Sequence, residues 1–316
     1  MNIAERLVEV AAHHGPVVVT VDGYDVIDCE ACGFRHINPL FSQQELKKFY
    51  DGEFYEKERA DYFVRMEEDK HWWMLRYRHY YELLETHTPG RRILDIGSGP
   101  GYFLEAGRLR GWQALGFEPS RLAADYAAAR GLEVVNDFFS ASSAKNCALF
   151  DAISLSMVLE HVRDPIKLIE EARSLLAPGG LLLLVSPNDF NPLQVSLWKT
   201  QGFAPWWVNP KHHLNYFDLA SGRCFMAARR FEILHQETSY PLEHFLLAGR
   251  NYVGNPDIGR ACHQERKAFE CAIFEKDPAL MRAFAAAWAG QGIGREFALL
   301  GRVQAQSRQE VVGQCR

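Results

Sequence analysis

A short stretch between residues 91 and 105 constrains the fold of this chain more than any other. Residues 93–96 form an apolar run of strand length, glycines cluster at 97–101, and residues 103–109 have the apolar spacing of a helix. A strand, a glycine turn and a helix in this order form the first βα unit of an open parallel sheet. The glycines permit a sharp bend and a close approach to a ligand. The helix directs free N–H groups and the positive end of its dipole toward that ligand.

The residue types at this turn narrow the choice of ligand. The dinucleotide-binding pattern G-x-G-x-x-G requires glycine where this chain has Tyr102, and the Gly-Lys-Ser/Thr of a phosphate-binding loop is absent. Asp95 ends the strand, and its charge would repel a pyrophosphate but suits a ligand that carries an amino group. The pattern resembles the first motif of class I S-adenosylmethionine-dependent methyltransferases. The resemblance implies cofactor binding by Asp95, Gly97, Ser98, Gly99 and Gly101; a glycine turn of another use is the alternative.

Two further strands end in acids and extend the resemblance. Strand 113–118 ends in Glu118, which lies 118 − 95 = 23 residues after Asp95, and Pro119 follows before the next helix. The resemblance implies that Glu118 and Pro119 belong to the cofactor site and that Glu118 accepts hydrogen bonds from both ribose hydroxyls. Strand 132–137 ends in Asp137, which the resemblance places on the adenine amino group, with Phe138 against the ring. A surface Glu118 and an ordinary loop Asp137 are the alternatives.

The segment after strand 150–157 borders the methyl donor in the resembling family, which implies contacts from Ser156 and Met157. Some relatives bind a divalent ion with a pair like Glu160-His161 and a third acid, but Met157 occupies the place of that acid. His161 is a candidate catalytic residue, and packing or capping at the start of the next helix is the alternative. Helix 166–176, the turn 177–180 and strand 181–185 complete the family pattern. The predicted fold class is α/β, a Rossmann-like methyltransferase sheet of seven strands, mostly parallel with an antiparallel last strand, and helices on both faces.

The N-terminal 42 residues carry a different pattern. Two β-branched runs around Asp22-Gly23 predict a β-hairpin over residues 17–27. Cys29 and Cys32, followed by Gly33, have the spacing of a zinc knuckle, but a tetrahedral site requires four ligands. The remaining ligands could come from His13, His14 and His36. The segment resembles the second of two such knuckles at the start of many small bacterial methyltransferases; a hairpin without metal is the alternative.

Aromatic residues are abundant in two segments of the sequence, residues 43–90 and residues 189–217. Residues 43–90 look helical, and the resemblance makes Tyr55 and Trp72 candidates for cofactor contact, with helix packing as the alternative. Residues 189–217 lack strong periodicity and contain His213, in register with a histidine of relatives. His213 could take a proton from a substrate hydroxyl or bond to loop backbone. Helical residues 241–292 interrupt the end of the sheet; Arg295, beyond them, could hold an anionic substrate group or belong to a hinge.

These patterns predict three parts: residues 1–42, a methyltransferase core of 43–240 with 293–306, and a helical cap of 241–292, for which a dimerisation arm is the alternative. The expected activity is S-adenosylmethionine-dependent methyl transfer to a small molecule, foremost a sugar or nucleotide-linked glycan intermediate. A small aromatic or natural-product hydroxyl, and a cofactor-binding pseudoenzyme that acts on a partner, are the alternatives. A net charge of −5 argues against nucleic acid. Seven cysteines, mostly scattered, predict a cytoplasmic protein, and the absence of a signal peptide and of an apolar run of roughly 20 residues predicts no membrane binding. The resemblance implies a bacterial protein, and a monomer and a homodimer both stay open.

Overall fold

The computed structural model describes residues 13–42, 45, 62–144 and 147–304. Tyr55, a candidate for cofactor contact, lies outside the described residues. The chain divides into two compact units. The first unit contains the described residues of Met1–Leu40, Ser186–Phe225 and His235–Leu299, and the second contains those of Phe41–Val185, Met226–Leu234 and Leu300–Arg316.

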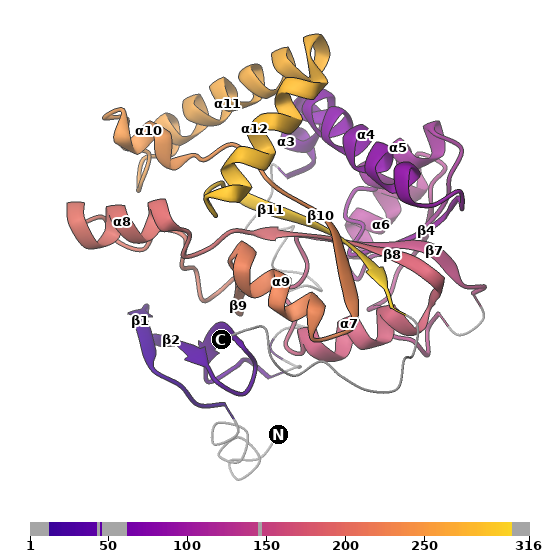
Figure 1. The fold of residues 1–316 in the computed structure, drawn as a ribbon, viewed down its shortest axis with the longest axis horizontal. Coiled ribbons are helices and arrows are strands. Elements are labelled where there is room, and N and C mark those ends of the chain that lie inside the picture. Colours follow the sequence, from indigo (N-terminus) through magenta and orange to yellow (C-terminus); the bar gives the residue numbers. More distant parts are fainter. Residues whose placement is uncertain (1–12, 43–44, 46–61, 145–146, 305–316) are drawn as a thin grey trace. The chain divides into compact units, whose positions relative to one another are not determined.

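A seven-stranded sheet has the order β10-β11-β8-β7-β4-β5-β6 (Figure 1). As predicted, it is mostly parallel, with an antiparallel strand at the end of the chain. Its first strand in the chain, β4, pairs in parallel with both β5 and β7. The chain therefore leaves β4 toward one edge and returns toward the other, and ligands of open α/β sheets bind at such a switch point. The strands are β4 (Arg92–Ile96), β5 (Gln113–Phe117), β6 (Glu133–Val135), β7 (Phe150–Ser156), β8 (Leu176–Pro187), β10 (Phe231–Thr238) and β11 (Glu296–Val303).

Two helices of the second unit, those that begin at Arg121 and Pro165, start at a side-chain cap. The Asp164 side chain accepts the N–H of Lys167 and Pro165 occupies the first turn of α7, so both N-terminal preferences are met. The predicted boundary between this helix and the next strand differs from the structure, because residues 177–180 already belong to β8. The helices are α3 (Tyr62–Glu68), α4 (Lys70–His87), α5 (Tyr102–Leu109), α6 (Arg121–Ala128) and α7 (Pro165–Ser174).

The first unit contains a four-stranded sheet of order β1-β2-β3-β9. The predicted hairpin is confirmed: β1 (Val17–Val21) and β2 (Tyr24–Cys29) pair antiparallel around Asp22 and Gly23, both with positive φ. Strand β3 (Phe34–Asn38) pairs with β2 on one side and with β9 (Asn215–Tyr216) on the other. The N-terminal segment is thus hydrogen-bonded to a segment about 180 residues further along the chain.

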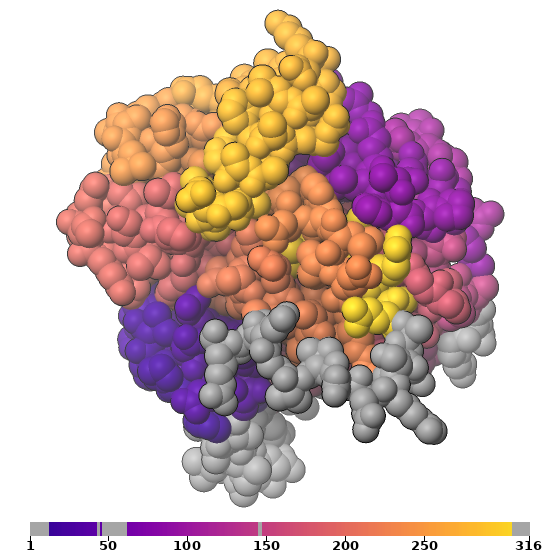
Figure 2. Space-filling view, viewed as in Figure 1, coloured from indigo at the N-terminus to yellow at the C-terminus, as the bar shows by residue number. Residues whose placement is uncertain are grey.

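Helices form the rest of the first unit. Residues 189–217 lack strong periodicity in the sequence, yet α8 (Pro192–Gln201) forms there, with a capping box of Asn191 and Gln194 at its start. Helix α9 (Leu219–Ala227) continues into the second unit. The predicted insertion contains α10 (Glu243–Leu247), α11 (Pro256–Lys276) and α12 (Pro278–Gly290), and α11 and α12 lie at the surface (Figure 2). The predicted division into three parts stays a prediction; its N-terminal and cap parts both fall in the first unit. Among the described residues, no helix is both long and apolar enough to cross a bilayer.

Candidate functional site

The glycine turn after β4 is hydrogen-bonded to the end of β5 and packs against the Val158 side chain. The N–H groups of Gly97 and Ser98 donate to the carbonyl of Phe117 at 2.8 and 3.1 Å, which ties the turn to the end of β5. A Cβ on Gly97 would lie 2.6 Å from the Val158 side chain. A Cβ on Gly99 would meet nothing closer than the Tyr62 hydroxyl at 3.6 Å. Gly97 is therefore required by packing, whereas Gly99 leaves its backbone accessible to a ligand.

Glu118 connects the glycine turn to the start of α6. Its two carboxylate oxygens accept the N–H groups of Gly99 and Ser120, each at 2.8 Å. Burial raises the pKa of Glu118, and the two backbone bonds oppose that rise. Each carboxylate oxygen keeps a second lone pair, so Glu118 can also accept hydrogen bonds from two ligand hydroxyls. Pro119 lies between Glu118 and the helix cap Ser120.

Asp95 is a buried carboxylate at the carboxyl end of β4, 3% exposed. No described residue hydrogen-bonds to its Oδ1 atom. Burial raises the pKa of Asp95 to about 7; the Ser154 hydroxyl lowers it and Glu118 adds to the rise. A buried polar atom without a partner is rare in a folded protein. A ligand with an N–H or ammonium donor would supply the missing partner.

The predicted adenine-binding residues lie on the surface beside Glu118. Strand β6 ends at Val135, shorter than predicted, and Asn136 donates to the Glu118 carbonyl at 2.9 Å. Asp137 accepts the N–H of Phe138 at 2.8 Å, and the Phe138 side chain is 43% exposed. Both side chains are thus exposed and accessible to a ligand.

Helix α3 supplies two contacts that the sequence analysis did not single out. Tyr62 places its hydroxyl over Gly99. Glu67 accepts the Tyr102 hydroxyl at 2.6 Å, so the residue that breaks the dinucleotide pattern joins α3 to α5. The sequence shows many aromatic residues between 43 and 90, but it does not distinguish Tyr62 from its neighbours. Trp72 is buried, and its ring packs against Trp73 and under the Arg76 guanidinium.

The segment after β7 has an unusual backbone. Ser156 ends the strand, and Met157 has a φ of 56°, a left-handed conformation that costs a non-glycine residue free energy. Its N–H donates to the Val185 carbonyl at 2.8 Å. His161 lies in the following turn, 3.8 Å from Glu160. Asp164 caps α7, so His161 does not cap it.

His213 belongs to the first unit and lies in a turn before β9. Its N–H donates to the Asn209 carbonyl at 2.8 Å, and its ring lies 6.4 Å from that of Tyr216. The side chain is half-buried. Its role as a base stays a prediction.

The first unit also contains a buried acid that the sequence analysis missed. Asp189 follows the end of β8 and is 1% exposed. No described residue hydrogen-bonds to either of its carboxylate oxygens, and the nearest Arg295 nitrogen lies 3.6 Å away. Burial raises the pKa of Asp189 to about 7; Arg295 lowers it, and Glu243 and Asp218 add to the rise. We call Asp189, Glu243 and Arg295 the Asp189 cluster.

Polar side chains hold the backbone around Asp189 in place. Asn188 donates to the carbonyls of Gly292 and Gly294 at 2.9 and 3.1 Å, which fixes the segment before Arg295. The Asn191 amide reaches Glu243 at 3.4 Å. Phe190, like Met157, has a left-handed backbone conformation, with a φ of 57°. The sequence signal was an acid directly after the fifth parallel strand, where ligands bind in such sheets.

Comparisons with known proteins agree with this geometry. A family model described as a methyltransferase domain matches residues 65–236, more than half of the 316 residues. A ubiquinone biosynthesis O-methyltransferase of Actinobacillus pleuropneumoniae is 29% identical over 157 residues, which cover 43% of this chain and 67% of that protein. The protein of the same description from Haemophilus ducreyi is 33% identical over 109 residues, which cover 31% of this chain and 46% of that protein.

The fold is also similar to that of a SAM-dependent methyltransferase from Archaeoglobus fulgidus, with a TM-score of 0.50 and 16% identity. That match covers 76% of this chain and 99% of the solved one. The family match over more than half of the chain decides the assignment, and the sheet order agrees with it. The chain therefore belongs to the methyltransferase domain family and is an S-adenosylmethionine-dependent methyltransferase.

Proposed function

We propose that this enzyme methylates a hydroxyl group of a small polar acceptor, foremost a sugar or nucleotide-linked glycan intermediate. The observation that carries the proposal is the Asp189 cluster: a buried carboxylate without a hydrogen-bond partner among the described residues, next to an arginine. Buried charges are costly unless they serve a ligand or are paired. Asp189 lies two residues after the end of strand β8, the region where open α/β sheets bind ligands.

The residues of the second unit fit the cofactor. The Glu118 carboxylate has lone pairs for the two ribose hydroxyls, and Asp95 offers a buried oxygen to the amino group of the methionine part. Gly99 lets the backbone approach closely, and Asp137 with Phe138 is accessible to the adenine. When bound, S-adenosylmethionine supplies an electrophilic methyl group on a sulfonium.

The protein contributes to catalysis mainly because it orients the acceptor and excludes water. A hydroxyl must also lose its proton as the new O–C bond forms, and Asp189 is our first candidate to take it. A pKa of about 7 suits a general base near neutral pH. Arg295 stabilises the ionised carboxylate before the transfer. His213 is the second candidate.

Two observations bear on the acceptor class. Charged residues in the Asp189 cluster favour an acceptor rich in hydroxyl or phosphate groups, because an arginine binds phosphate oxygens well. The curated relatives are named O-methyltransferases of ubiquinone biosynthesis, and no sugar appears in these names, so we keep a small aromatic hydroxyl as the second candidate acceptor. A group of aromatic rings next to Asp189 in sequence supports that second candidate: the centroid of the Trp207 ring lies 5.4 Å from that of Phe190 and 4.9 Å from that of Trp206.

Calorimetry with S-adenosylhomocysteine, followed by an assay of acceptors, tests the proposal. We expect binding of S-adenosylhomocysteine and methylation of a nucleotide sugar, measured as product mass. The matched comparison is a set of catechols at the same concentration. Methylation of catechols alone would favour the aromatic candidate. An enzyme that binds no S-adenosylhomocysteine would contradict the assignment of the cofactor residues.

A further inference from the structure

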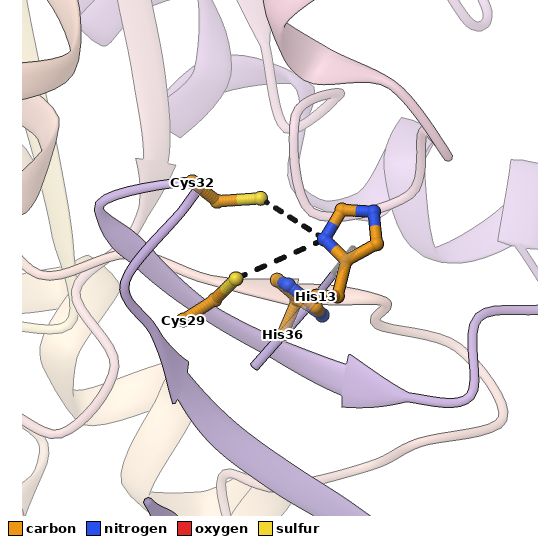
Figure 3. A group of neighbouring side chains, drawn as sticks. All are labelled: His13, Cys29, Cys32 and His36. Carbon is orange, nitrogen blue, oxygen red and sulfur yellow. Dashed lines mark hydrogen bonds between the residues drawn. The ribbon is translucent and has the colours of Figure 1, made fainter. Parts of the chain in front are cut away.

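Four potential metal ligands meet at the end of the N-terminal hairpin. His13, Cys29, Cys32 and His36 each offer one ligand atom, and these atoms all lie within 4.8 Å of one another (Figure 3). His13 precedes β1, Cys29 ends β2, Cys32 lies in the turn after it, and His36 is in β3. We propose that these four side chains bind a structural Zn²⁺ ion. His14, which the sequence offered as an alternative ligand, is exposed and lies 3.6 Å from Glu30 instead.

The distances match those of a tetrahedral site. The His13 Nδ1 atom lies 3.3 Å from Cys32 Sγ and 3.8 Å from Cys29 Sγ. With a Zn–S bond of about 2.3 Å, a Zn–N bond of about 2.0–2.1 Å and a tetrahedral angle, sulfur and nitrogen ligands lie about 3.5 Å apart. The two distances lie on either side of this value. A metal ion can therefore enter with small side-chain adjustments.

His36 is prepared as a ligand by the rest of the fold. Its ring is 1% exposed, and its Nδ1 atom lies 2.8 Å from the Ile37 carbonyl. Because a carbonyl only accepts, Nδ1 carries the proton and Nε2 keeps its lone pair. No described residue hydrogen-bonds to Nε2. A metal-binding histidine usually donates its other ring N–H to a carbonyl or carboxylate in this way.

The backbone brings the ligands together. The Gly33 N–H donates to the Cys29 carbonyl at 2.9 Å, and Gly33 has a φ of 75°, which closes the turn between the two cysteines. Residues 14–16 pair with the end of β2: the Glu30 N–H donates to the His14 carbonyl and the Asp28 N–H to the Pro16 carbonyl, both at 2.9 Å. A Cβ on Gly15 would lie 1.9 Å from the Asp28 carbonyl oxygen. Glycine at this position thus permits the approach that places His13 beside Cys29.

The ligand set indicates a structural role. Four protein ligands leave no open position for water or substrate, which distinguishes structural from catalytic zinc sites. The site joins the segment before β1 to β2 and β3. His36 also pairs with Asn215 of β9, two residues after His213. Metal binding would therefore stabilise the sheet that fixes the backbone of this candidate catalytic segment.

X-ray absorption spectroscopy of the full chain, purified and reconstituted with zinc, tests the proposal without a mutation. We expect one zinc per chain with two sulfur ligands at about 2.3 Å and two nitrogen ligands at about 2.0–2.1 Å. A shell of oxygen and nitrogen alone, a content far below one zinc per chain, or an oxidised Cys29–Cys32 pair in the freshly purified protein would overturn it.

Variants identify the ligands. Cys29→Ser and His36→Ala should each lower the zinc content and the melting temperature of the zinc-loaded protein. His14→Gln, at the neighbouring histidine, and Cys147→Ser, at a cysteine of the second unit, should leave both unchanged. Full zinc retention in Cys29→Ser, or equal loss in all four variants, would contradict the assignment. Should Cys29→Ser not fold, the sulfur-to-metal absorption band of the cobalt-substituted wild type gives the same answer, since it requires thiolate ligands.

Discussion

The glycine turn of the second unit and the Asp189 cluster of the first unit are assembled in opposite ways. Asp95, Gly99 and Glu118 lie within 24 residues of sequence, on two adjacent parallel strands and their turns. Asp189, Glu243 and Arg295 come from three segments spread over more than 100 residues. A ligand site built from one supersecondary unit leaves a motif in the sequence. A site built by tertiary contacts leaves only separate residues, and its function must be tested residue by residue.

The largest expected effect concerns the Asp189 cluster. Asp189→Asn should lower kcat by about 10²–10⁴-fold, the range of a lost general base, while binding of S-adenosylhomocysteine stays unchanged. In the wild type, kcat should rise with pH through about 7, because only the ionised Asp189 accepts a proton. The variant should lose this rise.

Asp257→Asn, an exposed acid at the start of α11, is the matched control and should keep the wild-type rate. If His213→Gln removes the pH dependence and Asp189→Asn retains it, His213 is the base and the cluster only binds the acceptor.

The next effect concerns the cofactor turn. Glu118→Gln keeps the shape of the side chain but loses its charge and one acceptor atom. A hydrogen bond to a charged group contributes about 1.5–3 kcal/mol, so the dissociation constant of S-adenosylhomocysteine should rise about 10- to 100-fold. Glu133→Gln, on the exposed side of neighbouring strand β6, should leave it unchanged in calorimetry. Equal affinities for the two variants would place the ribose elsewhere.

Two glycines with the same φ allow the cost of a side-chain clash to be measured separately from the cost of backbone strain. Gly101 and Gly111 both have a φ of 81°, but a Cβ on Gly101 would lie 2.6 Å from the Leu132 side chain, whereas a Cβ on Gly111 would meet nothing within 4 Å. Gly111→Ala should cost about 1–2 kcal/mol through backbone strain alone. Gly101→Ala should cost about 1–3 kcal/mol more through overpacking. Urea unfolding measures both, and equal losses would show that Leu132 moves aside freely.

A further effect is a change in the pH dependence of stability. The pKa of Asp95 is about 7 in the folded protein against an ordinary value of 3.8, so the folded state binds more protons between these values. The contribution of Asp95 to the free energy of unfolding is therefore fully present below about pH 4 and is lost as the pH rises to about 7. Asp95→Asn removes this slope, so the variant should gain stability relative to the wild type from pH 5 to 8. The exposed Asp125→Asn should run parallel to the wild type; an unchanged slope in Asp95→Asn would mean that Asp95 is ionised throughout.

The sequence predicted the second unit well because its information is local. An apolar strand, glycines with positive φ and an acid at the strand end specify the βα units of Asp95 and Glu118 within a few residues. The same local logic located the hairpin over residues 17–27 and the helices of the insertion. The sequence analysis was wrong at the start of β8, where residues 177–180 belong to the strand and not to a turn. Helix α8 begins at a capping box, in a segment for which weak periodicity had given no prediction.

Tertiary structure alone decided which isolated polar residues meet. Nothing near Asp189 in the sequence shows that Arg295 lies 3.6 Å from it. The sequence also does not show that burial raises the pKa of Asp189 to about 7. The Cys29-x-x-Cys32 spacing likewise left its other ligands open among three histidines. Pairing of residues 14–16 with β2 turns His13 toward the two sulfurs, and pairing of β3 with β9 buries His36. Local propensity determines the elements of this protein, whereas burial and long-range strand pairing determine the chemistry of its side chains.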